Sequence, residues 1–486
     1  MQLILKNAPC ANPNSSLNRG KKMSLSDGKI KRDNFTSRWG FVLASIGSAV
    51  GMGNIWRFPV MISTYGGLTF LIPYVIFVII IASTGVIEEF SLGRLFSSGP
   101  IGAFKGAMES YAEDNNKSVK KAGNVGKSLG FIPVLGSLAM AIGYTVVMSW
   151  ILKYAFMSVF GSLYAMGQDM DVIGATFGET ASAWGANIWI VLTICVSFII
   201  MFFGVSGGIE RANKVMMPIL FFLFVALGIY ISTLNGASEG YKYIFSINLP
   251  EFASVQDAFK FWAKILVFAF GQAFFSLSVA GNGSVIYGSY LKKDADLPLS
   301  SRNVAVFDTL AAILAALVII PAIATTGGVV STGGPGLMFI YLVNVINGMA
   351  GGRIIGAIFF IIVTFAGLSS IINLYETPIA FLQDEFKIKR SIATVIMHVL
   401  GGGIAICIQA ITAQWMDVVS IYVCPLGALL AGIMFFYFLN KDKALSEVNR
   451  GSKKPIGKWF YPAGKYVYCS LALIALVCGA FFGGIG

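Results

Sequence analysis

Charged side chains are scarce in this sequence. Asp, Glu, Lys and Arg together make up 12% of its 486 residues, whereas 56% are apolar. Typical soluble domains carry about 25% charged residues, so this composition excludes an ordinary soluble protein. Histidine is limited to His398, and of six cysteines only Cys10 lies outside an apolar stretch or its edge. The sequence therefore indicates neither a disulfide framework nor a Cys/His metal cluster.

Residues suited to catalysis are also lacking. A membrane enzyme needs a nucleophile, a general base or a metal cluster, and the sequence shows none. Gly204-Val-Ser-Gly-Gly208 has the spacing of a serine-hydrolase elbow, but it lies at the end of an apolar span and not between a strand and a helix. We interpret His398 as a packed or interfacial side chain and not as a proton relay, because it stands alone in its span.

Long apolar runs dominate the chain instead. A transmembrane helix needs about 20 apolar residues, and hydropathy indicates eleven spans. They predict an all-α polytopic membrane protein that forms one bundle. The predicted spans are 39–65, 68–96, 129–160, 185–204, 213–233, 259–291, 303–330, 353–384, 390–411, 415–439 and 459–484.

Basic residues gather in alternate loops between these spans. The loops 94–128 and 440–458 are rich in Lys and Arg, whereas 161–184 contains neither. By the positive-inside rule, the basic segment 1–38 is a cytoplasmic tail, and an odd number of spans places the C-terminus outside. The net charge of +12 is thus an orientation signal and does not indicate nucleic-acid binding. The Gly-rich stretch 331–352 is predicted to be a long outer loop.

Two spans are interrupted by glycine and polar residues. The first contains Gly47–Pro59 and the sixth contains Gly281-Asn-Gly283. Non-helical backbone at membrane depth survives only where protein buries it or where it lines a cavity. Because the two spans are five apart, the halves 39–233 and 234–439 would form an inverted repeat, with 440–486 adding a loop and an eleventh helix. This predicts a transporter site at mid-membrane; the alternative is glycines that only allow close helix packing.

Longer motifs connect the chain to a known family. They are Ser37-Arg-Trp-Gly-Phe, the whole of Gly47–Pro59, Tyr65-Gly-Gly, Ile72-Pro-Tyr, Glu89–Arg94, Phe274-Phe-Ser-Leu-Ser, Phe365-Ala-Gly-Leu-Ser-Ser and Phe381-Leu-Gln-Asp-Glu. With them the chain resembles the neurotransmitter:sodium symporter family, in its bacterial branch with the leucine-transporter-type fold. The resemblance implies a secondary active transporter that imports an amino acid with sodium by alternating access. It also implies a bacterial plasma membrane and a monomer or homodimer.

The resemblance implies two sodium sites built from oxygen ligands, which suit an alkali cation. The first would use the Ala49 carbonyl, Asn54, Ser276, a residue of the seventh span and the carboxylate of the substrate. The ligands of the second would be the carbonyls of Gly47, Val50 and Ala366 and the hydroxyls of Ser369 and Ser370.

The substrate carboxylate would meet the Tyr144 hydroxyl and the amides near Gly51 and Gly53. The side-chain end of the pocket would be lined by Ser48, Met140, Phe275, Ser278, Gly281, Ser370 and Leu374. The family's leucine-type members have a bulky aromatic where Gly281 stands, so we expect a hydrophobic or aromatic amino acid. Another small amine or zwitterion remains the alternative, and an ion channel a further one.

Gates are implied on both sides of this pocket. An intramembrane charge costs several kcal/mol unless it is paired or hydrated, so Arg57 and Asp417 would pair as the outer gate. The inner gate would consist of Arg32 and Asp384, with Tyr290 and Phe35 bracing it. Glu89 matches a family glutamate that supports the unwound first span, whereas Glu88 either has a similar role or faces water.

Asp308 is the only carboxylate inside the seventh span. The family's animal members bind chloride beside the first sodium, through a serine whose position here is Ala312. Asp308 would supply the negative charge there, so we expect sodium coupling without a chloride requirement. On the empty return step it would carry a proton.

Overall fold

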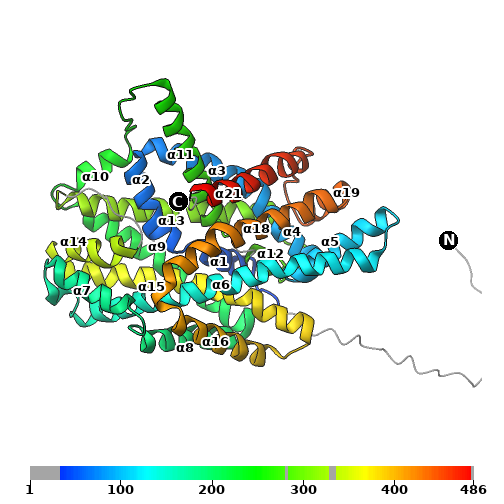
Figure 1. The fold of residues 1–486 in the computed structure, drawn as a ribbon, viewed down its shortest axis with the longest axis horizontal. Coiled ribbons are helices and arrows are strands. Elements are labelled where there is room, and N and C mark those ends of the chain that lie inside the picture. Colours follow the sequence, from blue (N-terminus) through cyan, green and yellow to red (C-terminus); the bar gives the residue numbers. More distant parts are fainter. Residues whose placement is uncertain (1–32, 280–282, 328–334, 483–486) are drawn as a thin grey trace, which may run out of the picture. The chain divides into compact units, whose positions relative to one another are not determined.

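The computed structural model describes residues 33–279, 283–327 and 335–482, and the regular elements in these ranges are helices joined by turns and short loops (Figure 1). The only extended pairing among them is an isolated antiparallel bridge between Gly67 and Ile247. The α-helices are α1 (Arg38–Ala49), α2 (Phe58–Tyr65), α3 (Leu68–Ile81), α4 (Ile87–Phe96), α5 (Pro100–Asp114), α6 (Val119–Phe160), α7 (Met170–Ala181), α8 (Asn187–Phe202), α9 (Glu210–Ser232), α10 (Ala237–Ile244), α11 (Val255–Ser276), α12 (Gly283–Gly288), α13 (Leu297–Ala324), α14 (Leu342–Gly348), α15 (Gly352–Phe386), α16 (Arg390–Cys407), α17 (Thr412–Val418), α18 (Cys424–Ile433), α19 (Lys441–Asn449), α20 (Phe460–Pro462) and α21 (Cys469–Phe482).

Several of these helices join end to end through single π-helical turns. The turn Ala82–Val86 joins α3 to α4 in this way, and Gly53–Arg57 precedes α2. Within the described residues, nine continuous helical segments are long and apolar enough to cross a membrane. The all-helical membrane class is therefore confirmed. Two other predicted spans are a broken segment, Arg38–Tyr65, and the 16-residue α8, so the count of eleven stays a prediction.

The segments predicted as loops contain additional helices. The stretch 94–128 holds α5 and the first turns of α6, so the helix that contains the third predicted span begins at Val119, ten residues before that span. The helical spacing of apolar residues explains this difference. Helix α5 buries Ile101, Phe104 and Ala107 on one face, and a hydropathy average over a mostly polar segment does not detect such a one-sided pattern. Likewise, the predicted outer loop 331–352 contains α14 and a π-helical turn, Leu337–Tyr341.

Helix α1 lies among the other helices and not at their edge. It packs against α9, α13 and α15, while the long helices α6 and α15 run side by side (Figure 1). Nine of its twelve residues are buried, including an unbroken run from Ala44 to Ala49. A helix buried all round has to be apolar or small on every face, which explains its content of Ala, Gly and Ser.

Candidate functional site

The first helix ends inside the protein. After Ala49 the backbone turns extended at Val50, where φ is −70° and ψ is 102°. Asn54 holds the following turn, because its Oδ1 accepts a hydrogen bond from the Gly51 amide at 3.1 Å. A Cβ at Gly51 would lie 2.8 Å from Ser370 Oγ, and one at Gly53 would lie 2.9 Å from the Phe275 ring. Glycine at these two positions therefore lets the broken backbone approach α15 and α11.

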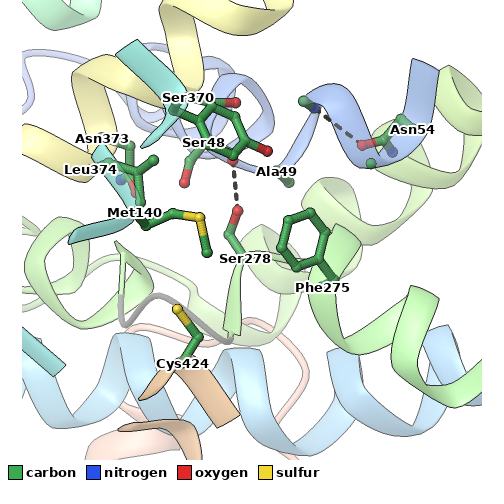
Figure 2. Close-up of a pocket in the computed structure, with 13 residues that line it drawn as sticks. Ser48, Ala49, Asn54, Met140, Phe275, Ser278, Ser370, Asn373, Leu374 and Cys424 are labelled. Atoms are coloured by element: carbon green, nitrogen blue, oxygen red, sulfur yellow. Dashed lines mark hydrogen bonds between the residues drawn. The ribbon is translucent and has the colours of Figure 1, made fainter. Parts of the chain in front are cut away.

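A second break faces the first. Helix α11 ends at Ser276, and Ser278 has a left-handed φ of 56°. The Ser278 hydroxyl donates to the Ser48 carbonyl at 2.6 Å, which ties the two breaks together (Figure 2). The sixth span is thus interrupted before the predicted Gly281-Asn-Gly283, and Gly281 itself lies outside the described residues.

A cavity of about 50 Å³ lies between the two breaks (Figure 2). Apart from Ser276, every predicted substrate-binding residue that the structure describes lines it. Asn54 of the predicted sodium site lines it too, together with Asn373 and Cys424, which sequence reasoning missed. Among the described residues, the lining is Ser48, Ala49, Gly51, Gly53, Asn54, Met140, Tyr144, Phe275, Ser278, Ser370, Asn373, Leu374 and Cys424.

A polar cluster adjoins this cavity. The Asn54 amide nitrogen donates to Asp308 Oδ1 at 2.8 Å and to Ser276 Oγ at 2.9 Å, and the Ser276 hydroxyl donates to Asp308 Oδ2 at 2.6 Å. All three side chains are buried. Among the described residues Asp308 has no ion-pair partner, so its neighbours are neutral oxygens and an amide. Asn54, Ser276 and Asp308 were all predicted for the first sodium site, and the structure brings their side chains together.

The residues predicted for the second sodium also converge. The hydroxyls of Ser369 and Ser370 both donate to the Ala366 carbonyl, at 3.0 and 3.1 Å. A Cβ at Gly47 would lie 2.9 Å from Ser369 Cβ, and only 2.1 Å from Oδ1 of Asn213 in α9. That oxygen is buried without a hydrogen-bond donor in the described structure. Asn213 was not predicted, because nothing in the sequence links the fifth span to Gly47.

A larger cavity of about 350 Å³ adjoins the first one, and Gly53, Tyr144 and Phe275 line both. Arg57 and Asp417 both line the larger one. Their predicted ion pair is not formed here: none within 4.0 Å joins them, and the Arg57 guanidinium lies 5.4 Å from the Phe275 ring centroid. Both residues line the same cavity, and their pairing in a closed state stays a prediction.

Arg32 of the predicted inner gate lies outside the described residues, and Asp384 accepts a hydrogen bond from the Ser98 hydroxyl. Phe35 packs edge-on against Tyr290, with ring centroids 6.4 Å apart. The Tyr290 hydroxyl donates to Glu376 Oε1 at 2.5 Å. Sequence reasoning missed this glutamate and its partner, Arg390 of α16, whose two terminal nitrogens donate to its two oxygens at 2.7 Å. A carboxylate inside an apolar span signals that Glu376 needs a partner, but nothing in the sequence identifies Arg390 as that partner.

Three other polar residues can now be placed. Glu88 is 0% exposed, so the reading in which it faces water is wrong. Like Glu89, it has no hydrogen-bond partner among the described residues. His398 is buried and stacks on Tyr375 with ring centroids 4.6 Å apart, which agrees with a packed side chain. The Gly204–Gly208 stretch enters a π-helical turn, Val205–Ile209, and forms no hydrolase elbow.

An all-helical membrane protein in which two broken helices meet at a cavity has the arrangement typical of secondary transporters. The sequence matches the Sodium:neurotransmitter symporter family over residues 32–167 and 175–480, and the chain belongs to that family. It is 30% identical over 465 residues to the uncharacterized sodium-dependent transporter YhdH of Bacillus subtilis, covering 91% of this chain and 96% of that one. It is 26% identical to the sodium-dependent serotonin transporter of Drosophila melanogaster, covering 72% of this chain and 59% of that protein.

A solved structure is similar as well. The crystal structure of MhsT in complex with L-phenylalanine superposes with a TM-score of 0.78 at 31% identity, covering 92% of this chain and 100% of that one. The protein is thus a sodium-dependent membrane transporter and not an enzyme. The predicted family, fold and sodium dependence are confirmed.

Proposed function

We propose that this protein imports an amino acid together with sodium by alternating access, across a bacterial plasma membrane. The observation that carries the proposal is the cavity where the Gly51 and Gly53 backbone, the Tyr144 side chain and Phe275 meet, next to the Asn54–Ser276–Asp308 cluster. The substrate carboxylate would lie near the Gly51 and Gly53 amides, because the start of a helix favours negative charge.

The substrate would be a hydrophobic or aromatic amino acid. Met140, Phe275 and Leu374 give the cavity apolar walls, while Asn373 and Ser278 add polar ones. The bound L-phenylalanine in the similar MhsT structure supports this class. A volume of about 50 Å³ holds only a few water molecules. Phe275, which lines both cavities, would therefore have to move for an amino acid to enter.

Two sodium ions would bind, one at Ala49, Asn54, Ser276 and Asp308, the other among Gly47, Val50, Ala366, Ser369 and Ser370. A buried carboxylate needs a cation or a proton. Asp308 would therefore provide the negative charge beside the first sodium, and transport would need no chloride. On the empty return step, Asp308 would exchange its sodium for a proton. The basic loops support a cytoplasmic N-terminus and an external C-terminus.

The test is uptake into proteoliposomes under an inward sodium gradient, after a thermal-stabilisation screen of the twenty amino acids with and without sodium. We expect saturable, sodium-dependent uptake of a large apolar amino acid. Preferential stabilisation by glycine or alanine over tryptophan, tyrosine and leucine would refute the substrate class. Flux that does not saturate would instead favour a channel. Stabilisation by a different amine or zwitterion would favour the alternative transporter.

A further inference from the structure

A third cavity lies where α13 begins, apart from the two central ones. It has a volume of about 280 Å³ and shares no lining residue with them. Its walls come from the first turns of α13 and from the chain segment after α19. They are Asp296, Pro298, Leu299, Arg302, Ser452, Lys453 and Lys454.

The cavity carries an excess of positive charge. Arg302, Lys453 and Lys454 have no ion-pair or side-chain hydrogen-bond partner among residues 33–279, 283–327 and 335–482. Its one carboxylate, Asp296, is already engaged: Oδ1 accepts the Leu299 amide and Oδ2 accepts the Lys453 amide, both at 3.1 Å. The cavity therefore has three cationic side chains and one carboxylate whose two oxygens already accept hydrogen bonds. This excess of positive charge favours the binding of an anion.

The walls are held in place by a buried arginine. Arg94 forms an ion pair with Glu447 at 2.6 Å, donates to the Ala295 carbonyl at 2.6 Å, and donates to the Arg450 carbonyl at 3.3 Å. It thus links the segment before α13 to the segment after α19. Gly451, at a φ of 77°, packs so closely on Asp294 that a Cβ would lie 2.2 Å from its carbonyl oxygen. These contacts fix the two walls of the cavity relative to each other.

The cavity also adjoins a lipid-facing surface. Helix α13 is one of the segments able to cross a membrane. Val306 and Leu310, four and eight residues after Arg302, are 57% and 41% exposed. Residues four apart share a helix face, so Arg302 ends a stripe that faces lipid acyl chains. An arginine there reaches toward the headgroup layer.

We propose that this cavity binds the phosphate group of an anionic phospholipid of the cytoplasmic leaflet, with an acyl chain lying along Val306 and Leu310. The leaflet follows from the orientation proposed above. Basic pockets at the ends of membrane helices bind lipid headgroups through charge-assisted hydrogen bonds. The basic segment 1–31 of the same chain is an unsuitable occupant, because its charge has the same sign.

The test compares two variants of equal charge change in delipidated protein. Arg302→Gln/Lys453→Gln/Lys454→Gln removes the cavity cations, and Lys120→Gln/Lys441→Gln/Lys458→Gln removes three exposed cations outside it. Native mass spectrometry would follow bound phosphatidylglycerol, with phosphatidylcholine as the neutral lipid. At about 1 kcal/mol per basic residue, the cavity variant should bind phosphatidylglycerol about a hundredfold more weakly. The control variant should lose no more than a few-fold.

Thermal melting distinguishes a lipid from a free anion. Phosphatidylglycerol should raise the melting temperature of the wild type and the control variant, but not that of the cavity variant, whereas inorganic phosphate or glycerol phosphate should have little effect. Equal losses in the two variants would overturn the proposal, as would equal protection by soluble phosphate. Should the triple variant fail to fold, Arg302→Gln alone, which breaks no hydrogen bond or ion pair among the described residues, should weaken lipid binding about fivefold; unchanged binding would also overturn the proposal.

Discussion

Asp308 places a carboxylate in a membrane-spanning helix with only neutral neighbours in the described structure. Its two oxygens accept hydrogen bonds from Asn54 and Ser276, and these two residues are also predicted ligands of the first sodium. Hydrogen bonds alone do not offset the burial of a charge in such a site. A bound cation does, and Asp308 would then supply the charge that chloride supplies in the family's animal members.

Replacing Asp308 with asparagine removes that charge and retains the size of the side chain. We expect wild-type uptake to be unchanged when gluconate replaces chloride, and uptake by Asp308→Asn to become chloride-responsive or to be lost. The measurement is sodium-driven uptake in proteoliposomes with either anion. A wild type that loses uptake in gluconate would show that Asp308 does not substitute for chloride.

Gly47 has no room for a side chain. A Cβ there would lie 2.1 Å from Asn213 Oδ1 and 2.9 Å from Ser369 Cβ, and inserting a methyl group into a well-packed site costs about 1–3 kcal/mol. We expect Gly47→Ala to lower the melting temperature in detergent and to weaken the effect of sodium on it, because Ser369 belongs to the proposed second site.

The matched control is Gly403→Ala in α16, where an added Cβ meets no atom within 4 Å. That variant should melt at the wild-type temperature or slightly above, because alanine favours a helix over glycine. Adding Asn213→Ala to Gly47→Ala should restore part of the lost stability. No recovery in the double variant would argue against the clash with Asn213.

Three helical elements meet at Glu376. Tyr290 follows α12, Glu376 lies in α15 and Arg390 begins α16, so one carboxylate joins three segments beside the proposed inner gate. Glu376 is fully buried, and the Arg390 side chain is only 16% exposed. Removing one partner of a buried pair leaves the other charge uncompensated, at a cost of about 3–5 kcal/mol.

We therefore expect Glu376→Gln to lower the melting temperature by several degrees, and Arg390→Gln to do the same. Glu239→Gln is the control, because it breaks the exposed Lys242–Glu239 pair, and exposed pairs contribute at most about 1 kcal/mol. A similar small shift in all three variants would mean that the Glu376–Arg390 pair does not hold these elements together.

The elements also show what the sequence could and could not predict. Gly47, Gly51 and Gly53 lie within an apolar run that is long enough to span a membrane. Because glycine destabilises a helix, the break in the first span could be predicted from the sequence alone. Helices α5, α14 and α19 could not be predicted in this way, because their segments are too polar or too short to stand out in a hydropathy average. The Glu376–Arg390 pair and the approach of Asn213 to Gly47 depend on which spans pack together, and no local pattern encodes that.

At the scale of the whole molecule, the two proposed sodium sites depend on the same broken segment. Asn54 connects the break after α1 to α11 and α13 through Ser276 and Asp308. Gly47 and Gly51 connect it to α15, where they lie against Ser369 and Ser370. The substrate cavity lies between these contacts. Binding of sodium at either site would therefore fix the backbone that the substrate contacts.

Coupling of this kind is reciprocal, because the factor by which sodium raises substrate affinity must equal the factor by which substrate raises sodium affinity. Coupling free energies of about 1–3 kcal/mol correspond to factors of about 5–150. We expect Asn54→Ala and Ser369→Ala each to weaken substrate binding and to shift its sodium dependence to higher concentrations. Equilibrium binding of radiolabelled substrate across a sodium titration measures both effects. If substrate binding by both variants kept the wild-type sodium dependence, neither residue would belong to a sodium site that acts on the substrate cavity.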